Sequence, residues 1–208
     1  MIMNFQPKLK IDYCTFTAAK HAVENWHYSE CMPAGKTIKL GVWEDDKFIG
    51  CVIFSRGANN VLGAPYGLTQ LESCELTRVA LKMHVTPVTR IISICIKFLK
   101  KFCPGIKLII SFADSEQGHH GGIYQGGNWI YAGRTKPAEE YIVNGVRMHG
   151  RSMRALHGTH IGKPFITKIM GSSKHRYLMP LTEELKEDLK KLSKPYPKRA
   201  KKEQSSTP

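Results

Sequence analysis

The sequence predicts an α/β fold, with a mixed and mostly antiparallel central sheet, one parallel strand–helix–strand unit, and helices on both faces. Three observations indicate this fold. Residues 38–57 form two apolar runs around an acidic turn, as in a β-hairpin. Residues 86–102 have helical signals and stand between two strand-like segments. Residues 106–114 are almost continuously apolar, as in a strand that helices cover on both faces.

The first third of the chain predicts a helix, the hairpin and a third strand. Residues 17–26 start with a threonine cap and continue with good helix formers and apolar residues at helical spacing. The hairpin turns at the acidic residues 44–46, and residues 72–81 alternate well enough to form a further strand. These elements form one side of the expected sheet.

The parallel unit is predicted from residues 72–114. Thr86 and Pro87 are signals for the start of a helix, and the run Cys103-Pro104-Gly105 stops it before the apolar strand at 106–114. A strand, a helix and a second strand in this order are expected to be parallel and connected in a right-handed sense. Ligands of such sheets bind at the carboxyl ends of the strands.

The last third of the chain predicts three more strands and a final helix. The strands are expected at 129–135, at 140–150 with a bend at the Asn-Gly pair, and at 176–181. A threonine followed by glutamates forms a capping box for a helix at 182–192. Residues 1–192 are therefore expected to form a single domain, and residues 193–208 a basic disordered tail.

The net charge predicts a polyanionic partner. The chain has 31 Lys and Arg against 17 Asp and Glu, a formal net charge of +14, and residues 190–208 supply about six of these charges. Because the body stays basic without its tail, nucleic acid is expected as the partner rather than a membrane, and the family resemblance described below implies double-stranded DNA. The tail residues expected to contact phosphates are Lys198, Arg199, Lys201 and Lys202.

The stretch from 111 to 133 contains groups that a packed core does not require. Asp114 follows the buried strand directly, and it could act in chemistry or simply cap the next turn. His119 and His120 could transfer protons or face water, and their role is left open. Gly121 and Gly122 would let backbone amides approach a ligand closely.

Other candidates lie far from this stretch in the sequence. His27 and Tyr28 follow the first predicted helix, where a helix-end histidine and a packed tyrosine are the simpler interpretation. Arg78 stands among apolar residues, so it is expected either to pair with a carboxylate such as Glu75 or to hold a substrate anion. No glycine-rich phosphate loop follows the third strand, so Lys82 with the start of the next helix is left as a candidate for holding a nucleotide.

Several segments resemble, in order, the Mom family of bacteriophage DNA-modification proteins. They are "WHYS", "MPAGK", "LGVWEDDKFIGCVIFSRGANN", "CELTRVAL", "LIISFAD" and "QGHHGGIYQGGNWIYAG", which together span roughly residues 20 to 135. The resemblance implies a GNAT-like acyltransferase fold. It also implies an enzyme that converts adenine in phage DNA to its N6-methylcarbamoyl (acetamido) form, which protects the DNA from host restriction.

The resemblance also implies which residues act. The matching positions are His27, Tyr28, Arg78, Asp114 and Tyr124. Asp114, assisted by His27, is expected to position or deprotonate the adenine amine, while the tyrosines line the pocket and Arg78 holds an anion. Iron is associated with the family, and His27, Tyr28 and Asp114 are the expected ligands.

The resemblance leaves the donor open. Ordinary GNAT enzymes hold coenzyme A on a glycine-rich loop, but the matching segment here, "RVALKM", contains no glycine. A coenzyme A thioester and a glycyl donor are both retained, with Arg78, Lys82, Gly121 and Gly122 as the expected binding residues. The alternative functions are an N-acyltransferase for a small-molecule or protein amine, and a non-catalytic nucleic-acid-binding module. The bacterial host cytoplasm is the expected location, and a homodimer is left open.

Overall fold

The structure is a computed structural model that describes residues 6–33, 35–57 and 61–199. The strands are β1 (Leu9–Tyr13), β2 (Thr37–Glu44), β3 (Lys47–Ser55), β4 (Ser73–Leu81), β5 (Leu108–Asp114), β6 (Ile130–Arg134), β7 (Glu139–Val143), β8 (Val146–His149), β9 (Ile166–Met170) and β10 (Lys174–Pro180). The helices are α1 (Phe16–Trp26), α2 (Val88–Phe102), α3 (Gly122–Gln125), α4 (Gly150–His157) and α5 (Glu183–Lys190), with 3-10 turns η1 (Ala64–Tyr66) and η2 (Ser115–Gln117).

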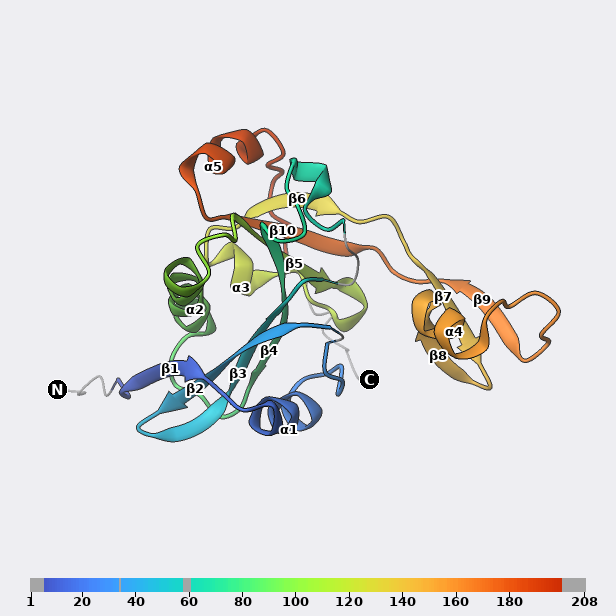
Figure 1. The fold of residues 1–208 in the computed structure, drawn as a ribbon, viewed down its shortest axis with the longest axis horizontal. Helices are drawn as coiled ribbons and strands as arrows, with labels where there is room; N and C mark the ends of the chain where they lie inside the picture. The colour runs from blue at the N-terminus through green and yellow to red at the C-terminus, as the bar shows by residue number, and fades with distance from the viewer. Residues whose placement is uncertain (1–5, 34, 58–60, 200–208) are drawn as a thin grey trace, which may run out of the picture.

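The central sheet has seven strands in the order β1-β2-β3-β4-β5-β10-β6 (Figure 1). Strands β4 and β5 are parallel, and the other neighbours in this sheet pair antiparallel. The predicted hairpin, the parallel β4–α2–β5 unit and the mixed, mostly antiparallel sheet are thereby confirmed.

Helices cover both faces of this sheet. Neighbouring residues of a strand point to opposite faces, so their contacts show which helix covers each face. On β3, Val52 and Phe54 belong to the core cluster that contains the buried face of α2, whereas Cys51 and Ile53 pack with α1. Further along the sheet, α5 packs with Leu108 and Ile110 of β5. The residue between those two on β5, Ile109, joins the α2 cluster instead.

Strands β4 and β5 pair over only a short distance and then part. Their register covers Ser73–Glu75 of β4 and Leu108–Ile110 of β5. Beyond it, the buried Ser111 hydroxyl reaches across and donates a hydrogen bond of 2.8 Å to the main-chain oxygen of Leu76. The sheet therefore opens between its two parallel strands, on the carboxyl-terminal side of this bond.

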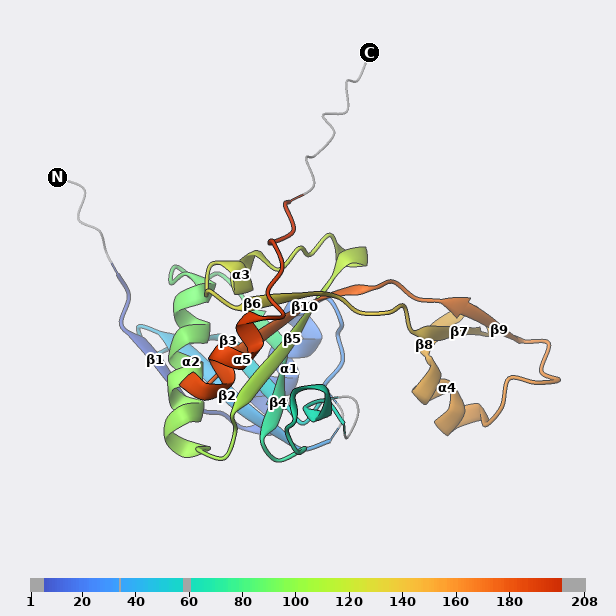
Figure 2. The same ribbon diagram turned by 90° about the horizontal axis from the view of Figure 1, so that it is seen from above.

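A small second sheet projects from the body as an arm (Figures 1 and 2). It has the order β8-β7-β9 and carries α4, with a core of Tyr141, Val143, Met153 and Ile166. The prediction of a single bent strand at 140–150 is wrong, because Asn144 and Gly145 both have positive φ and form the turn of the β7–β8 hairpin. The Asn-Gly pair is itself a strong hairpin signal.

The beginning of the expected disordered tail is ordered against the body. The Lys194 amide donates to the main-chain oxygen of Tyr131 at 2.9 Å, and the Tyr196 hydroxyl donates to that of Trp129 at 2.7 Å. Disorder therefore does not begin at residue 193 as expected. Residues 200–208 lie outside the described part of the chain.

Helix starts differ from the expected positions by a few residues. Thr15, rather than Thr17, caps α1 by accepting a hydrogen bond of 3.2 Å from the Ala18 amide. Helix α2 starts at Val88 with Pro87 at its cap, and Thr182 caps α5 as expected. Among the helices of the described chain, none is both long enough and apolar enough to cross a membrane.

Candidate active site

A cavity of about 1040 Å³ lies where β4 and β5 part. Its walls come from the loop after α1, the middle of β4, the segment from β5 to α3 and the base of the arm. The volume is at the top of the roughly 300–1,000 Å³ range usual for small-molecule sites, so there is room for two substrates. Of the sequence candidates, those that line it are His27, Tyr28, Arg78, His119, His120, Gly121, Gly122, Tyr124 and Arg199.

Tyr124 is fixed at the floor of the opening by Ser111. The two hydroxyl oxygens are 2.7 Å apart. Since Ser111 gives its only hydrogen to Leu76, the phenol is the donor in this pair. Burial raises the pKa of Tyr124 to about 12. The phenol therefore keeps its proton at neutral pH.

His27 is a neutral ring whose tautomer is set by the main chain. The Ser29 amide donates to its Nδ1 at 3.1 Å, so the ring proton belongs on Nε2. Burial lowers the pKa of His27 to about 4, helped by the charges of Arg78 and His119. His27 is consequently a hydrogen-bond donor through Nε2 and a weak base.

Tyr28 forms an aromatic wall with two histidines. Its ring centroid lies 4.4 Å from that of His27 and 5.4 Å from that of His119, in a tilted and an edge-on arrangement. Burial raises the pKa of Tyr28, against the nearby charge of Lys174. This wall offers flat apolar surface on which a heterocyclic ring can stack.

Arg78 brings a cation to the cavity and holds the loop after α1 in place. Its Nε donates to the main-chain oxygen of Cys31 at 3.0 Å, and one terminal nitrogen donates to that of Thr77 at 2.8 Å. Both acceptors are uncharged, so these bonds position the guanidinium without cancelling its charge. This favours the expected alternative in which Arg78 holds a substrate anion.

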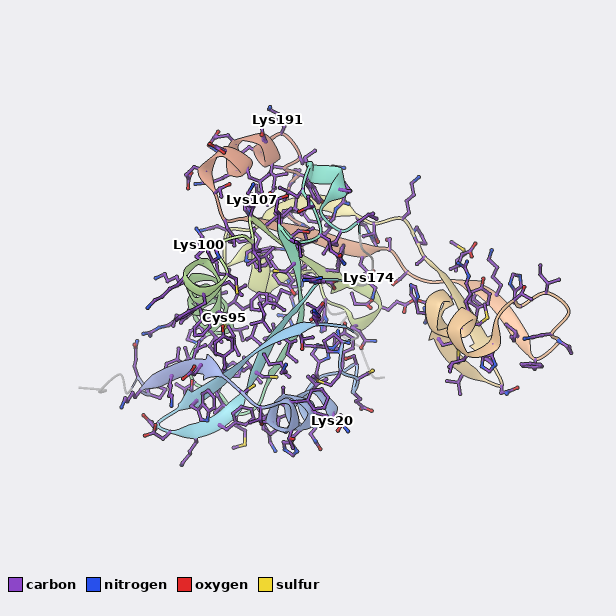
Figure 3. All side chains as sticks on the ribbon, viewed as in Figure 1. Lys20, Cys95, Lys100, Lys107, Lys174 and Lys191 are labelled. Carbon is purple, nitrogen blue, oxygen red and sulfur yellow. The ribbon has the colours of Figure 1, made fainter. Side chains whose placement is uncertain are left out.

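Asp114 stands behind the cavity rather than in its lining. One carboxylate oxygen accepts from the Glu116 amide at 3.0 Å and caps η2, and the other pairs with Lys174 Nζ at 2.9 Å. Burial alone would raise the pKa of Asp114, but Lys174 outweighs it and holds that pKa below its ordinary value. Lys174 lines the cavity, and Figure 3 labels it at the side of the body that faces the arm. Asp114 is thus connected to the cavity through its ion pair with Lys174.

Two expected donor-binding residues, Gly121 and Lys82, make packing contacts, and of these two only Gly121 lines the cavity. Gly121 has a φ of +85°, and a side chain there would collide with the ring of Tyr177, so the glycine permits close packing of α3 on β10. Lys82 lies 5.7 Å above the ring of Trp26 and is not among the residues that line the cavity. Gly122 does line it, beside His120.

The end of the described chain reaches the cavity. Arg199 contributes to its lining, whereas Lys198 does not. The expected phosphate contacts Lys201 and Lys202 lie outside the described residues. Basic residues at the base of the arm, Lys136 and Lys174, add to the positive charge around the opening.

The expected iron ligands do not assemble into a metal site. In the part of the chain that the structure describes, no group of three or more His, Cys, Asp or Glu side chains is placed to hold a metal ion. Nδ1 of His27 is taken by Ser29, and the two oxygens of Asp114 are taken by Lys174 and Glu116. The expectation that His27, Tyr28 and Asp114 bind iron is therefore not supported.

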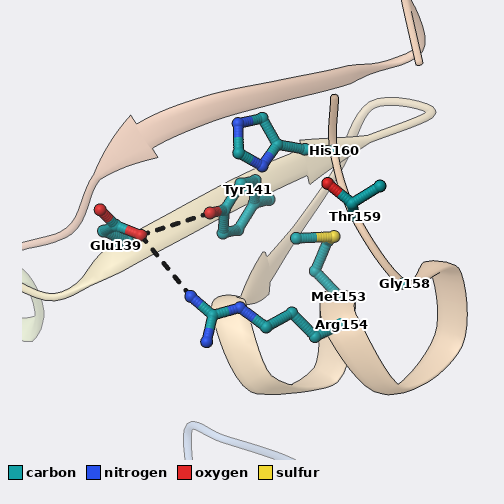
Figure 4. A pocket seen from close by; sticks show the side chains of 7 residues that line it. All are labelled: Glu139, Tyr141, Met153, Arg154, Gly158, Thr159 and His160. Carbon is teal, nitrogen blue, oxygen red and sulfur yellow. Dashed lines mark hydrogen bonds and ion pairs between the residues drawn. The ribbon is translucent and has the colours of Figure 1, made fainter. Parts of the chain in front are cut away.

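A second cavity, of about 440 Å³, lies in the arm between β7 and α4 (Figure 4). Tyr141 donates to Glu139 at 3.3 Å, and Arg154 lies 3.9 Å from the same carboxylate. Its charged groups are thus engaged with one another, which is consistent with a structural role.

Sequence reasoning missed Lys174, the cation that faces the cavity. It precedes the predicted strand at 176–181, but no sequence signal shows that this strand lies beside β5, where Lys174 is opposite Asp114 in the register. Glu140 and His149 also line the cavity, and they were missed as site residues because the predicted strand at 140–150 was not expected to lie beside it.

The sequence profile of the Mom protein family matches residues 8–198, almost the whole of the described chain. Among curated proteins, none matches the sequence.

Similar solved structures are acyl- and acetyltransferases. FeeM, an N-acyl amino acid synthase from uncultured soil microbes, is 10% identical with a TM-score of 0.50, over 85% of this chain and 92% of that chain. Spermidine/spermine N-acetyltransferase SpeG from Vibrio cholerae is 9% identical with a TM-score of 0.48, over 86% and 96%. An acetyltransferase from Bacillus subtilis is 12% identical with a TM-score of 0.43, over 85% and 100%. Such low identities show the fold alone, which is GNAT-like as expected.

Proposed function

This chain belongs to the Mom protein family, and we propose that it transfers an acetamido group to the N6 amine of adenine in double-stranded DNA. The product is N6-methylcarbamoyl adenine, which protects phage DNA from host restriction. The observation that carries the proposal is one cavity that joins stacking rings, fixed cations and a protonated phenol at the opening of the sheet.

Adenine has to leave the duplex for this reaction, because its N6 amine is engaged in the base pair. The wall formed by His27, Tyr28 and His119 supports the binding of a flipped base, since stacked rings receive purines without needing a fixed hydrogen-bond pattern. Arg199 at the opening and the basic residues beyond it support contact with the flanking phosphates.

In the transfer step, adenine N6 forms a bond to a carbon of the donor. The bond from that carbon to the leaving group breaks, and the leaving group keeps the electron pair. One N6 proton is released. Tyr124 supplies a proton to the leaving group once its hydroxyl turns from Ser111 toward the donor, because the phenol stays protonated at neutral pH. The Nε2 proton of His27 and the ammonium of Lys174 stabilise negative charge that develops on the donor.

The test is a mass measurement on nucleosides. Plasmid DNA is isolated from cells that express the protein, digested, and analysed for an adenine nucleoside that carries one acetamido substituent. Tyr124→Phe is expected to reduce that nucleoside by about 100-fold or more, as for loss of general acid catalysis. Tyr13→Phe, at an exposed tyrosine of β1, is the matched control and keeps the wild-type level.

An unmodified adenine pool at full expression contradicts the proposal. If the purified protein then acetylates small amines from acetyl-coenzyme A, the N-acyltransferase alternative replaces it. If it binds DNA and transfers nothing, a non-catalytic binding module is the correct description.

A further inference from the structure

A buried carboxylate from β2 accepts hydrogen bonds from the turn between β4 and α2, just before the helix starts. Glu44, at the end of β2, is 6% exposed. Its two oxygens accept hydrogen bonds from the main-chain amides of Thr86 at 2.6 Å and Val85 at 3.0 Å. Burial would raise the pKa of Glu44, but these bonds lower it below the ordinary value, so the group is an anion.

Amides at this place in an α/β sheet are where proteins bind phosphate groups. The start of a helix that follows a strand of a parallel unit combines free N–H groups with the positive end of the helix dipole. In this chain Glu44 binds the amides of Val85 and Thr86, which lie in the turn just before the helix starts at Val88. The next residue, Pro87, has no N–H to offer.

The cavity also stops short of this turn. On β4 its lining extends from Glu75 to Val79, and none of residues 80–88 takes part. Lys82, the nearest candidate for a phosphate contact, lies over the ring of Trp26. The opening between β4 and β5 and the start of α2 are therefore separate places.

A coenzyme A donor does not fit this arrangement. Its diphosphate would have to displace Glu44 or sit beside an ionised carboxylate, where like charges repel. We propose that Glu44 is a built-in anion that fills the phosphate position of the fold, and that the donor is an acyl or aminoacyl compound recognised through its transferable end alone. This inference rests on the proposed function only for the existence of a transfer reaction.

The first test compares two thioesters that differ in the phosphoadenosine diphosphate, of which the diphosphate is part. Dissociation constants of the purified wild-type protein are measured by calorimetry for acetyl-coenzyme A and for S-acetylpantetheine, which lacks the nucleotide diphosphate. Affinities within about threefold, or no binding of either, are expected. If acetyl-coenzyme A binds more tightly by about tenfold, which corresponds to 1.4 kcal/mol, the protein binds the nucleotide diphosphate and the proposal is overturned.

The second test opens the position itself, with inorganic pyrophosphate as the probe. Glu44→Ala frees two amides and removes the repelling charge, so pyrophosphate affinity should rise by about tenfold or more over wild type. Asp46→Asn removes one negative charge from the adjacent turn and should show no such rise. If the alanine variant fails to fold, Glu44→Gln replaces it, because it keeps one acceptor oxygen without the charge.

A folded Glu44 variant with unchanged pyrophosphate affinity overturns the role of Glu44 as the resident anion. Neither test uses DNA, so their failure is distinguishable from failure of the nucleoside measurement.

Discussion

The hydroxyl groups of Ser111 and Tyr124 are joined at 2.7 Å, and through Ser111 the phenol is connected to the main-chain oxygen of Leu76 at 2.8 Å. Three elements, β4, β5 and α3, thus meet at one buried side chain. The bond replaces a main-chain ladder where the two parallel strands part, and it fixes the phenol at the floor of the cavity. The Ser111 hydroxyl thus lies where the sheet opens and also holds the proton donor, Tyr124, in place.

Removing the serine hydroxyl should therefore affect both stability and activity. Ser111→Ala leaves the buried phenol and the Leu76 oxygen without this partner, and the free energy of unfolding should fall by about 1–3 kcal/mol. Urea denaturation measures the change. The double variant with Tyr124→Phe should lose less than the sum of the single variants, because the two share one interaction. Strict additivity would show that the pair is not coupled.

Asp114 and Lys174 should behave as one unit. Asp114→Asn removes the charge that orients the ammonium, so modified adenine should fall to the level of Lys174→Met, and the double variant should fall no further. The sign of the linked pH effect follows from the lowered pKa of Asp114. Its contribution to stability is present above the unfolded pKa and is lost as the pH falls through the folded one.

Acid thermal denaturation tests this sign. Wild-type melting temperature should drop more steeply below about pH 4 than that of Asp114→Asn, since the unfolded carboxyl titrates near there. If the melting temperatures of the two proteins fall in parallel with pH, the ion pair of Asp114 with Lys174 contributes no stability.

The neutral state of His27 predicts a second pH effect. Because its folded pKa is about 4, below the ordinary value of 6.5, the unfolded chain binds the extra proton first, and stability decreases as the pH falls from about 6.5 to 4. His27→Gln should flatten this part of the curve. His21→Gln, at an exposed position on α1, is the control and should leave it unchanged. Proton NMR of the ring resonances checks the assignment directly.

Two truncations separate the ordered segment from the basic end. Ending the chain after Pro197 removes the expected phosphate-binding residues but keeps the Tyr196–Trp129 bond. DNA binding should then weaken, and the slope of its salt dependence should become shallower by about 0.9 for each phosphate that is no longer neutralised. Ending the chain after Leu192 also removes the Tyr196–Trp129 hydrogen bond and the hydrogen bond from Gln125 to Pro197. Gln125 is the neighbour of Tyr124 in α3.

The shorter protein should therefore lose thermal stability as well as adenine modification, whereas the longer one should melt like wild type. Equal melting temperatures for the two would show that residues 193–197 contribute no support to α3.

Much of the body could be predicted because its signals are local. The hairpin around residues 44–46, the start of α2 after Pro87 and the capping box at Thr182 each depend on neighbours in sequence. The apolar strand at β5 was clear for the same reason. The arm was predicted only as one bent strand at 140–150, although Asn144-Gly145 is a strong turn signal, because its thin core of four buried side chains leaves little apolar pattern in the sequence.

By itself, the sequence determined the fold class, the basic character and the residue types of the site, since propensity, charge and motif order are properties of short segments. Only the tertiary structure decided that Lys174 is opposite Asp114, that Glu44 binds the turn just before α2, and that His27 is neutral. Each of these depends on register, burial or contact between segments that are distant in the chain, and these are set when the strands pack together.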